Sequence, residues 1–335
     1  MANADHSEAG EPGKPASRNN EIDPAVMAEF TKAIEAFRKA SSDGHGEQAE
    51  AAALQMLSLA AQEAERNPTP ELELAVEAGE CEARGAWDDA DAIYRRLLAM
   101  AEASDAPSQQ KFGRMFKVHR DRGSLFVLRS EYAQAHQTAL AALAAARLAD
   151  LQPLLVWALE FVAYCALRVQ DLAGALAAAN EAVGVIIEPE AIFDNLRAMA
   201  WVSRARCRVA AGDCSGAEED LAQSQPLVFR KGIFDWAAGL HRQAALWWEV
   251  RANLCERQEQ WRDAVEAWRQ AVACRRHVSS LPHVQGPHRL GALAGTLLRL
   301  GRALQECGDV PESERILAEG EKIWRELGLP AQAAL

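Results

Sequence analysis

The sequence predicts an all-α protein, a solenoid of about seven stacked antiparallel helix pairs. A short pattern of small, turn and aromatic residues recurs at fixed offsets along most of the 335-residue chain. Between the turn signals, apolar residues follow the spacing of amphipathic helices. Hydrophobic residues make up 49% of the chain and charged residues 25%, which suits a helical globular protein and excludes a wholly disordered one.

The clearest copy of the pattern lies near residue 80 and consists of Ala78, Gly85, Trp87, Ala90, Tyr94 and Leu97. Counted from Ala78, these residues stand at offsets 0, +7, +9, +12, +16 and +19. Further copies begin at Gly123, Ala163, Ala205, Ala252 and Gly301, with spacings of 45, 40, 42, 47 and 49 residues. The copies contain no gap inside the motif, which indicates one repeated structural unit.

Each offset has a physical role in a pair of packed helices. Alanine or glycine at offset 0, and alanine or serine at +12, allow two antiparallel helices to approach closely. Gly85, Gly212 and Gly308 stand at offset +7, where a turn between helices favours a residue without a Cβ atom. One unit cannot bury its apolar face alone, so neighbouring units are expected to stack.

Two segments carry a resemblance to a known family. Residues 85–94 read Gly-x-Trp-x-x-Ala-x-x-x-Tyr, and residues 260–264 read Gln-Trp-Arg-Asp-Ala. Together with the in-phase copies, they resemble the tetratricopeptide repeat (TPR) family over residues 71–328, with a weaker extension back to residue 24. This resemblance implies a right-handed, TPR-like α-solenoid. The spacings exceed the usual period of about 34 residues, so the chain is more similar to the long-helix arrays of MalT-like regulators and kinesin light chains. HEAT-type repeats have a similar period but lack these offsets.

The expected organisation has three parts. Residues 1–22 are rich in Gly, Pro, Ser, Asn and charge, and they predict a disordered tail. Residues 23–70 predict a helix pair with a degenerate repeat signature. Residues 71–335 form the array, with a loop insertion at 276–289 and a C-terminal capping helix. The face of that helix near Ile323 either caps the stack or offers a contact for a homodimer.

The resemblance also implies a binding surface, because the first helix of each pair lines the concave groove of such arrays. Offsets −6, −3, +1, +4 and +5 would face the groove. They select Lys117, Arg120, Trp157, Glu160, Tyr164, Arg168, Arg206, Glu249, Asn253, Arg257 and Arg302 as the candidate site. This mixture of arginine, aromatic and acidic residues suits a peptide that carries acidic and apolar side chains.

Two narrower sites are alternatives. Some TPR adaptors clamp a terminal carboxylate with Lys, Asn and Arg, but Asn253 stands three units away from Lys117 and Arg120. The segment from His277 to His288 contains three histidines, which can bind a metal. No cysteine or carboxylate joins them, so a surface loop or a secondary docking site is the better interpretation.

Charge and targeting signals exclude several classes of protein. The net charge is −12; residues 1–110 contribute −13 and the remainder +1, which argues against nucleic-acid binding. The N-terminus lacks the apolar core of a signal peptide, and apolar runs are too short to span a bilayer. Seven cysteines contain no Cys-x-x-Cys pair and predict reduced packing residues. We therefore expect a cytoplasmic protein with no membrane contact.

Catalytic signatures are poor. His119-Arg120-Asp121 copies a kinase triplet, but the required asparagine, the Gly-rich loop and Asp-Phe-Gly do not accompany it. There is no phosphate-binding loop and no dinucleotide fingerprint. The sequence thus predicts a protein that is not an enzyme and has no cofactor or metal: an adaptor, scaffold or regulatory subunit with a protein or peptide partner. The alternative is a sensory array that binds a small molecule or short peptide and regulates a separate effector chain.

Overall fold

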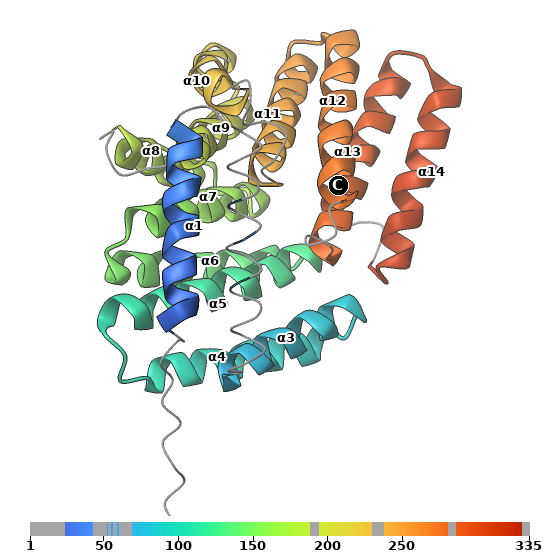
Figure 1. Ribbon diagram of the computed structural model, residues 1–335. Helices are drawn as coiled ribbons and strands as arrows, with labels where there is room; N and C mark the ends of the chain where they lie inside the picture. The colour runs from blue at the N-terminus through green and yellow to red at the C-terminus, as the bar shows by residue number, and fades with distance from the viewer. Residues whose placement is uncertain are drawn as a thin grey trace, which may run out of the picture.

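The computed structural model describes residues 24–42, 69–187, 194–229, 238–280 and 286–329, together with the single positions 52, 55 and 59. These residues form thirteen α-helices and no strand. The helices are α1 (Pro24–Ser42), α3 (Pro70–Ala83), α4 (Trp87–Ala103), α5 (Ser108–Leu128), α6 (Tyr132–Ala149), α7 (Gln152–Arg168), α8 (Leu172–Ile186), α9 (Asp194–Ala211), α10 (Cys214–Val228), α11 (Ala238–Arg257), α12 (Trp261–Ser280), α13 (Pro287–Glu306) and α14 (Val310–Glu326). From α3 onward they make six antiparallel pairs that stack along a curve (Figure 1).

The turn inside each of the six pairs has the same backbone conformation. The residue at offset +7 has a positive φ in every pair: Gly85 73°, Ser130 61°, Gln170 63°, Gly212 81°, Glu259 58° and Gly308 80°. The next residue donates its N–H to the carbonyl five positions earlier, as from Ala86 to Cys81 at 2.8 Å. This is the Schellman arrangement, which satisfies the free carbonyls at a helix C-terminus.

Aspartates begin the second helix in three of the pairs. The side chain of Asp171 accepts a hydrogen bond from the N–H of Gly174 at 2.9 Å, and that of Asp213 does the same for Gly216 at 3.0 Å. Asp309 caps α14 in the same way. Such N-caps satisfy an N–H that has no partner within the helix. The turn and the cap are adjacent in sequence, so a few residues define both helix ends.

Small residues hold the two helices of each pair together. The residues at offsets 0 and +12 are buried in all six pairs. In the last pair the Ser313 hydroxyl donates to the carbonyl of Gly301 at 2.7 Å. In the same pair, a Cβ atom on Gly301 would lie 2.6 Å from the Leu317 side chain of α14. Close approach is therefore required at these offsets, as the sequence predicts.

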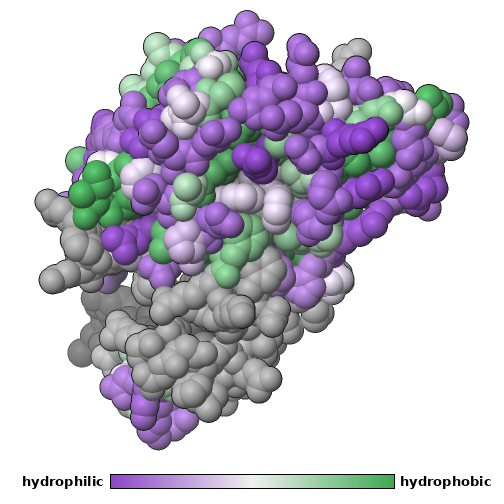
Figure 2. Space-filling view, turned by 90° about the horizontal axis from the view of Figure 1, so that it is seen from above, coloured by the Kyte–Doolittle hydropathy of each residue, from purple (hydrophilic) through white to green (hydrophobic). Residues whose placement is uncertain are grey.

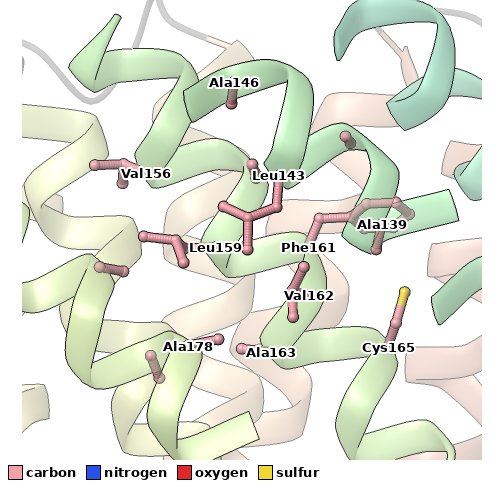
Figure 3. Packing of buried hydrophobic residues seen from close by; sticks show 14 of the residues in the cluster. Ala139, Leu143, Ala146, Val156, Leu159, Phe161, Val162, Ala163, Cys165 and Ala178 are labelled. Carbon is pink, nitrogen blue, oxygen red and sulfur yellow. The ribbon is translucent and has the colours of Figure 1, made fainter. Parts of the chain in front are cut away.

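The hydrophobic core runs through the stack as linked clusters. In Figure 3, small residues such as Ala139 on α6, Ala163 on α7 and Ala178 on α8 lie among larger ones, including Leu159 and Phe161. Leu159 is fully buried, which contributes about 2 kcal/mol relative to exposure. Alternating small and large side chains thus fill the space between neighbouring pairs.

The outer surface is mostly hydrophilic. In Figure 2 the described surface seen from above shows hydrophobic patches separated by hydrophilic side chains. None of the helices in the described ranges combines the length and hydrophobicity needed to cross a membrane.

The loop expected at 276–289 is shorter in the structure. Helix α12 continues to Ser280 and α13 begins at Pro287, which leaves residues 281–285 outside the described part. Ser279 hydrogen-bonds to the carbonyl of Arg275 within α12 at 2.9 Å. Proline at the first position of a helix loses no intrahelical hydrogen bond, so Pro287 begins α13 rather than interrupting it.

The N-terminal expectations are only partly within the described residues. Helix α1 falls inside the expected pair at 23–70. The tail at 1–22 and most of the second helix of that pair lie outside the described residues.

The turn geometry gives opposite expectations for two Gly→Ala substitutions. Gly308→Ala places a Cβ atom on a residue with φ of 80°, and it should lower the free energy of unfolding by about 1 kcal/mol. Gly184→Ala lies within helix α8 with open space around the new Cβ atom, and it should raise stability by about 0.5–1 kcal/mol. Chemical denaturation of both variants measures the difference. Equal effects would contradict the assigned turn.

Candidate functional site

The inner surface of the curve is formed by the first helices of the pairs. Helices α5 and α7, α7 and α9, and α9 and α11 contact each other across successive pairs. Since first helices are closest together on the inside of a curved stack, the side chains between these contacts face the interior. Ten of the eleven residues predicted to line a groove lie on these four helices, and Arg302 lies on α13.

The two ends of the described array meet. The His288 Nε2 atom of α13 lies 3.1 Å from the Glu82 Oε2 atom of α3, across 206 residues of sequence. Glu82 is buried and also accepts a hydrogen bond from the Tyr94 hydroxyl at 2.9 Å. Burial, the nearby Glu82 charge and this hydrogen bond raise the pKa of Tyr94 well above its usual range. Tyr94 therefore stays protonated, and its hydroxyl donates the hydrogen bond to Glu82.

An apolar contact supports the same closure. Leu128 at the end of α5 packs with Ala294 and Leu298 of α13 and with Trp324 of α14. Gly291 makes room for it, because a Cβ atom there would lie 2.8 Å from the Leu128 Cδ1 atom. We call this contact, together with Glu82–His288, the closing contact. It brings α13 back to α5 and bounds the interior (Figure 1).

The interior contains a cavity of about 320 Å³. Its wall is drawn from α5, α7, α9, α11, α12, α13 and α14 and from the start of α6. The lining residues are Val127, Leu128, Tyr132, Tyr164, Arg168, Arg206, Leu246, Glu249, Val250, Asn253, Trp268, Arg275, His288, Gly291, Ala292, Gly295, Thr296, Arg299 and Trp324. The wall combines arginine and aromatic side chains with one carboxylate.

Arginines lie over aromatic rings along one side of the interior. The Arg120 guanidinium lies 5.0 Å from the ring centroid of Trp157. That of Arg206 lies 5.7 Å from the centroid of Tyr164. Each contact joins neighbouring first helices and is worth about 0.5–2 kcal/mol. The contacts hold the arginines in place, and Arg120 also pairs with Asp121 at 2.8 Å.

Arg168 and the tyrosines form the adjoining part of this wall. Its guanidinium lies 4.3 Å from the Tyr132 ring centroid and donates a hydrogen bond to the Tyr132 hydroxyl. The buried Arg168 Nε atom has no hydrogen-bond partner in the described part of the chain. Burial raises the pKa of Tyr164 to about 12, against the opposing charge of Arg168. The tyrosine is therefore a neutral hydrogen-bonding group.

The opposite wall is organised by Glu249. Its Oε1 atom accepts from Arg275 Nη2 at 2.8 Å and from the Thr296 hydroxyl at 2.9 Å. The Asn253 side-chain amide donates to the Glu249 backbone carbonyl at 2.7 Å. These bonds tie α11 to α12 and α13 and occupy part of the carboxylate.

The structure separates the sequence-derived candidates into three groups. Tyr164, Arg168, Arg206, Glu249 and Asn253 line one cavity. Arg120, Trp157 and Glu160 lie beside it, where Glu160 pairs with Arg206 at 3.7 Å. The remaining candidates are outside the cavity wall: Lys117, Arg257 and Arg302.

Those three residues have different surroundings. Lys117 and Arg257 are exposed, and Arg302 is half-buried. Burial and the charge of Arg299 lower the pKa of Arg302. Since Gly291 and Gly295 form the wall in α13, the cavity face of this helix lies N-terminal to Arg302. The predicted role of these residues in a groove remains a prediction.

Several residues of the site were missed by the sequence offsets. Arg275 lies on a second helix and His288 falls in the expected loop, yet both line the cavity. No sequence signal places these two residues at the cavity.

Two of the three histidines of that expected loop lie in helices, and His283 lies outside the described residues. His288 makes the closing contact, and the His277 ring lies 4.1 Å from that of His241. Within the described ranges, no group of three or more His, Cys, Asp or Glu side chains has an arrangement that could hold a metal ion.

The comparisons with known proteins concern the fold. No family model matches the sequence, and no curated protein matches it. A Rap protein complexed with Competence and Sporulation Factor aligns with a TM-score of 0.57 at 11% identity, covering 91% of this chain and 78% of that one. The apo form of RapI gives 0.51 at 10% identity, with 91% and 99% covered. A tetratricopeptide repeat protein from Parabacteroides merdae gives 0.43 at 13% identity, with 88% and 99% covered.

The two Rap structures have TM-scores above 0.5 and share this fold. Together with the helix pairs described above, they confirm the predicted all-α, TPR-like solenoid.

The closing contact predicts that one core substitution opens the array. Leu128 is buried against α13 and α14, so Leu128→Ala should destabilise this contact by about 3 kcal/mol. Hydrogen exchange of α13 and α14 should accelerate, and the radius of gyration from X-ray scattering should increase. Leu140→Ala removes an exposed leucine from α6 and serves as the control. Unchanged exchange in α13 would show that the ends are not coupled.

The cysteines are expected to be unreactive except at the surface. Cys81, Cys165, Cys207, Cys255 and Cys274 are buried, and Cys307 is exposed. Burial raises the pKa of Cys207 and of Cys274 to about 11 in each case, so neither forms a thiolate nucleophile at neutral pH.

A thiol reagent should therefore modify Cys307 first in the native protein, and Cys207 and Cys274 only after unfolding. Peptide mass spectrometry assigns the sites. Rapid native modification of Cys207 would contradict its assigned burial.

Proposed function

We propose that the chain is a non-catalytic protein-interaction module, an adaptor, scaffold or regulatory subunit that binds a segment of a partner protein on its inner surface. The observation that carries this proposal is the row of arginine and aromatic side chains on α5, α7 and α9 beside the cavity. These side chains are held by contacts between helices, yet they remain partly exposed. Prearranged aromatic and arginine groups are the usual anchors of protein-binding surfaces.

The chemistry of the wall fits a peptide better than a flat protein surface. Leu246, Val250 and Trp268 offer apolar area within the cavity, and Arg206 and Arg168 offer directed donors. An extended or helical segment can place alternate side chains into such a concave surface. The Rap protein of similar fold was solved in a complex with Competence and Sporulation Factor. This analogy supports ligand binding by the fold without identifying a ligand for this chain.

One observation favours a second function, a sensory array that binds a small molecule or short peptide and regulates a separate effector chain. The closing contact bounds the interior, and the cavity of about 320 Å³ lies at the lower end of the volumes of small-ligand sites. A ligand that bridges α7 and α13 would change the stability of the closing contact. Thermal stabilisation by a metabolite, without a protein partner, would favour this function.

The proposal also covers the class of partner, the cellular compartment and the oligomeric state. The net charge of −12 argues against nucleic acid as the partner. The seven unpaired cysteines are compatible with a reducing compartment, and we place the chain in the cytoplasm. A homodimer through the terminal helices is retained as a proposal, although Trp324 of α14 is already buried in the closing contact.

Affinity capture from a lysate of the source cells tests the interaction function. The baits are the wild type, an Arg168→Glu/Arg206→Glu variant of the interior, and an Arg96→Glu/Arg262→Glu control with the same change of charge. Arg96 and Arg262 are exposed and lie outside the cavity wall. We expect a protein that is enriched by the wild type and by the control. The interior variant should not enrich it. Its binding segment is then confirmed with purified components.

Circular dichroism and thermal unfolding establish that the interior variant is folded. Equal enrichment by the folded interior variant would place the binding surface elsewhere. No enriched protein, together with stabilisation by a small molecule, would replace the adaptor function with the sensory one.

A further inference from the structure

The cavity of the interior is lined by four arginines from four helices. Arg168 belongs to α7, Arg206 to α9, Arg275 to α12 and Arg299 to α13. Glu249 is the one carboxylate among the described lining residues. The cavity therefore gathers positive charge in a chain whose net charge is −12. We call the four residues the cavity arginines.

Two of the cavity arginines have acidic partners. The Arg275 Nη2 atom lies 2.8 Å from Glu249 Oε1, which also accepts from the Thr296 hydroxyl. Arg206 lies 3.7 Å from Glu160, which stands beside the cavity. The carboxylates of Glu249 and Glu160 are thus already engaged.

Arg168 and Arg299 have no acidic partner among the described residues. Arg168 donates to the neutral Tyr132 hydroxyl, and its buried Nε atom has no hydrogen-bond partner there. Arg299 is half-buried and makes no ion pair or side-chain hydrogen bond within the described ranges. Charges that are removed from water are normally paired. Two guanidinium groups of the wall are therefore uncompensated by the described part of the protein.

Trp324 adds a further donor to the residues of this wall. Its side chain is 5% exposed, and the indole Nε1 atom has no hydrogen-bond partner in the part of the chain that the structure describes. Tryptophan and arginine side chains can only donate hydrogen bonds. Buried donors are nearly always satisfied in native proteins, so the wall residues lack acceptors. A ligand with negatively charged oxygen atoms would supply both the acceptors and the opposite charge.

Arginines outside the cavity show the usual arrangement. Arg204 of α9 pairs with the buried Asp220 of α10 at 2.7 Å, and Arg276 of α12 pairs with Glu319 of α14 at 2.7 Å. These ion pairs connect helices, as expected for structural arginines. Arg168 and Arg299 differ because they face a cavity and have no such partner. Departures from the usual pairing are expected at functional sites.

Apolar side chains form another part of the wall. Val250 of α11 and Trp268 of α12 are buried lining residues, and Leu246 is half-buried. The volume of about 320 Å³ is at the lower end of the range for small-ligand sites, which usually combine an apolar lining with a few directed polar groups. The cavity thus suits a small molecule that carries both an oxyanion group and an apolar body.

Resting on the proposed sensory function, we propose that the cavity binds a small organic anion. Its carboxylate or phosphate group accepts hydrogen bonds from Arg168 and Arg299, and its apolar body packs against Leu246 and Val250. Guanidinium groups match both kinds of oxyanion in a planar, two-bond geometry.

The same ligand strengthens the closing contact. Leu128, His288 and Trp324 belong to that contact and also line the cavity. An anion held by Arg168 and Arg299 joins α7 to α13, and α7 packs on α5, which carries Leu128. Binding therefore holds the two ends of the array together, which gives a small molecule control over the shape of the inner surface.

Isothermal titration calorimetry on the full chain tests the inference with defined probes. The probes are octanoate and octyl phosphate. Octanamide is the neutral counterpart of octanoate, and inorganic phosphate is the head group without an apolar body. The variant is Arg299→Gln, which removes an arginine without an ion pair in the described ranges. The matched control is Arg262→Gln, which removes an exposed charge outside the cavity wall.

The wild type and the control should bind octanoate or octyl phosphate alike, and the tighter of the two identifies the preferred head group. Arg299→Gln should bind that probe about tenfold or more weakly. Octanamide should not bind measurably, and added salt should weaken the wild-type interaction.

Hydrogen exchange tests the effect on the closing contact. The bound probe should slow exchange in α13 and α14 of the wild type, and it should do so less in Arg299→Gln at the same probe concentration. Binding without slower exchange in these helices would overturn the link to the closing contact.

Three results would overturn the anion site itself: no binding of either anionic probe, equal binding of octanamide, or equal binding by Arg299→Gln and the control. Inorganic phosphate that binds as tightly as octyl phosphate would also overturn it and assign the arginines to free anions. A peptide of alternating glutamate and leucine that binds through Arg299, while neither small anion binds, would assign the cavity to a partner segment instead.

The result is separable from the proposed functions. If neither small anion binds while Arg168→Glu/Arg206→Glu still loses the captured partner, the anion site fails and the interaction function stands. If an uncharged metabolite stabilises the protein, the sensory function stands without the anion site. If octanoate binds as predicted while every bait enriches the same partner, the anion site stands and the partner binds elsewhere.

Discussion

The close approach of two helices at small residues is the constraint on which the rest of this structure depends. Gly301 and Ser313 meet at a hydrogen bond of 2.7 Å between hydroxyl and carbonyl, and the corresponding residues of the other five pairs are buried. This approach sets the angle between the two helices of each pair. The residue with positive φ at offset +7 reverses the chain, and larger residues fill the space between pairs. Because the same geometry repeats, the stack curves and the first helices come together on the inside. The inner surface and its cavity are consequences of that repetition.

Much of the fold could be predicted because its determinants are local. The offsets locate six turns, and even Ser130, Gln170 and Glu259 adopt the conformation that glycine favours, since the flanking helices impose it. The closing contact was not predictable. It depends on Glu82 and His288, which are 206 residues apart, and on Leu128 meeting Gly291. The small rotations between units add up along a stack, and no local sequence pattern indicates the total rotation between its ends. The length of α12 was also underestimated, because proline and histidine near residue 280 suggested a loop.

The candidate site was predictable to a similar degree. Five residues chosen by offset, Tyr164, Arg168, Arg206, Glu249 and Asn253, line one cavity, because a helical stripe keeps its direction over two turns. The stripe did not identify the cavity residues of α13. Gly291 and Gly295 form part of the wall there, and Arg302 lies outside it. Residues brought by a second helix, such as Arg275, follow from the packing of pairs and have no signature in a single repeat. Whether any of these residues binds a partner is a question of function that the fold alone leaves as a proposal.

We propose that a ligand binds to the inner surface of the curve. Hydrogen exchange measured by mass spectrometry, with and without the captured partner segment, is the measurement to make. Exchange should slow along the first helices, in segments that contain Tyr164–Arg168 of α7 and Leu246–Asn253 of α11, with little change in second helices such as α8 and α10. Protection confined to those second helices or to the outer surface would show that the ligand binds elsewhere.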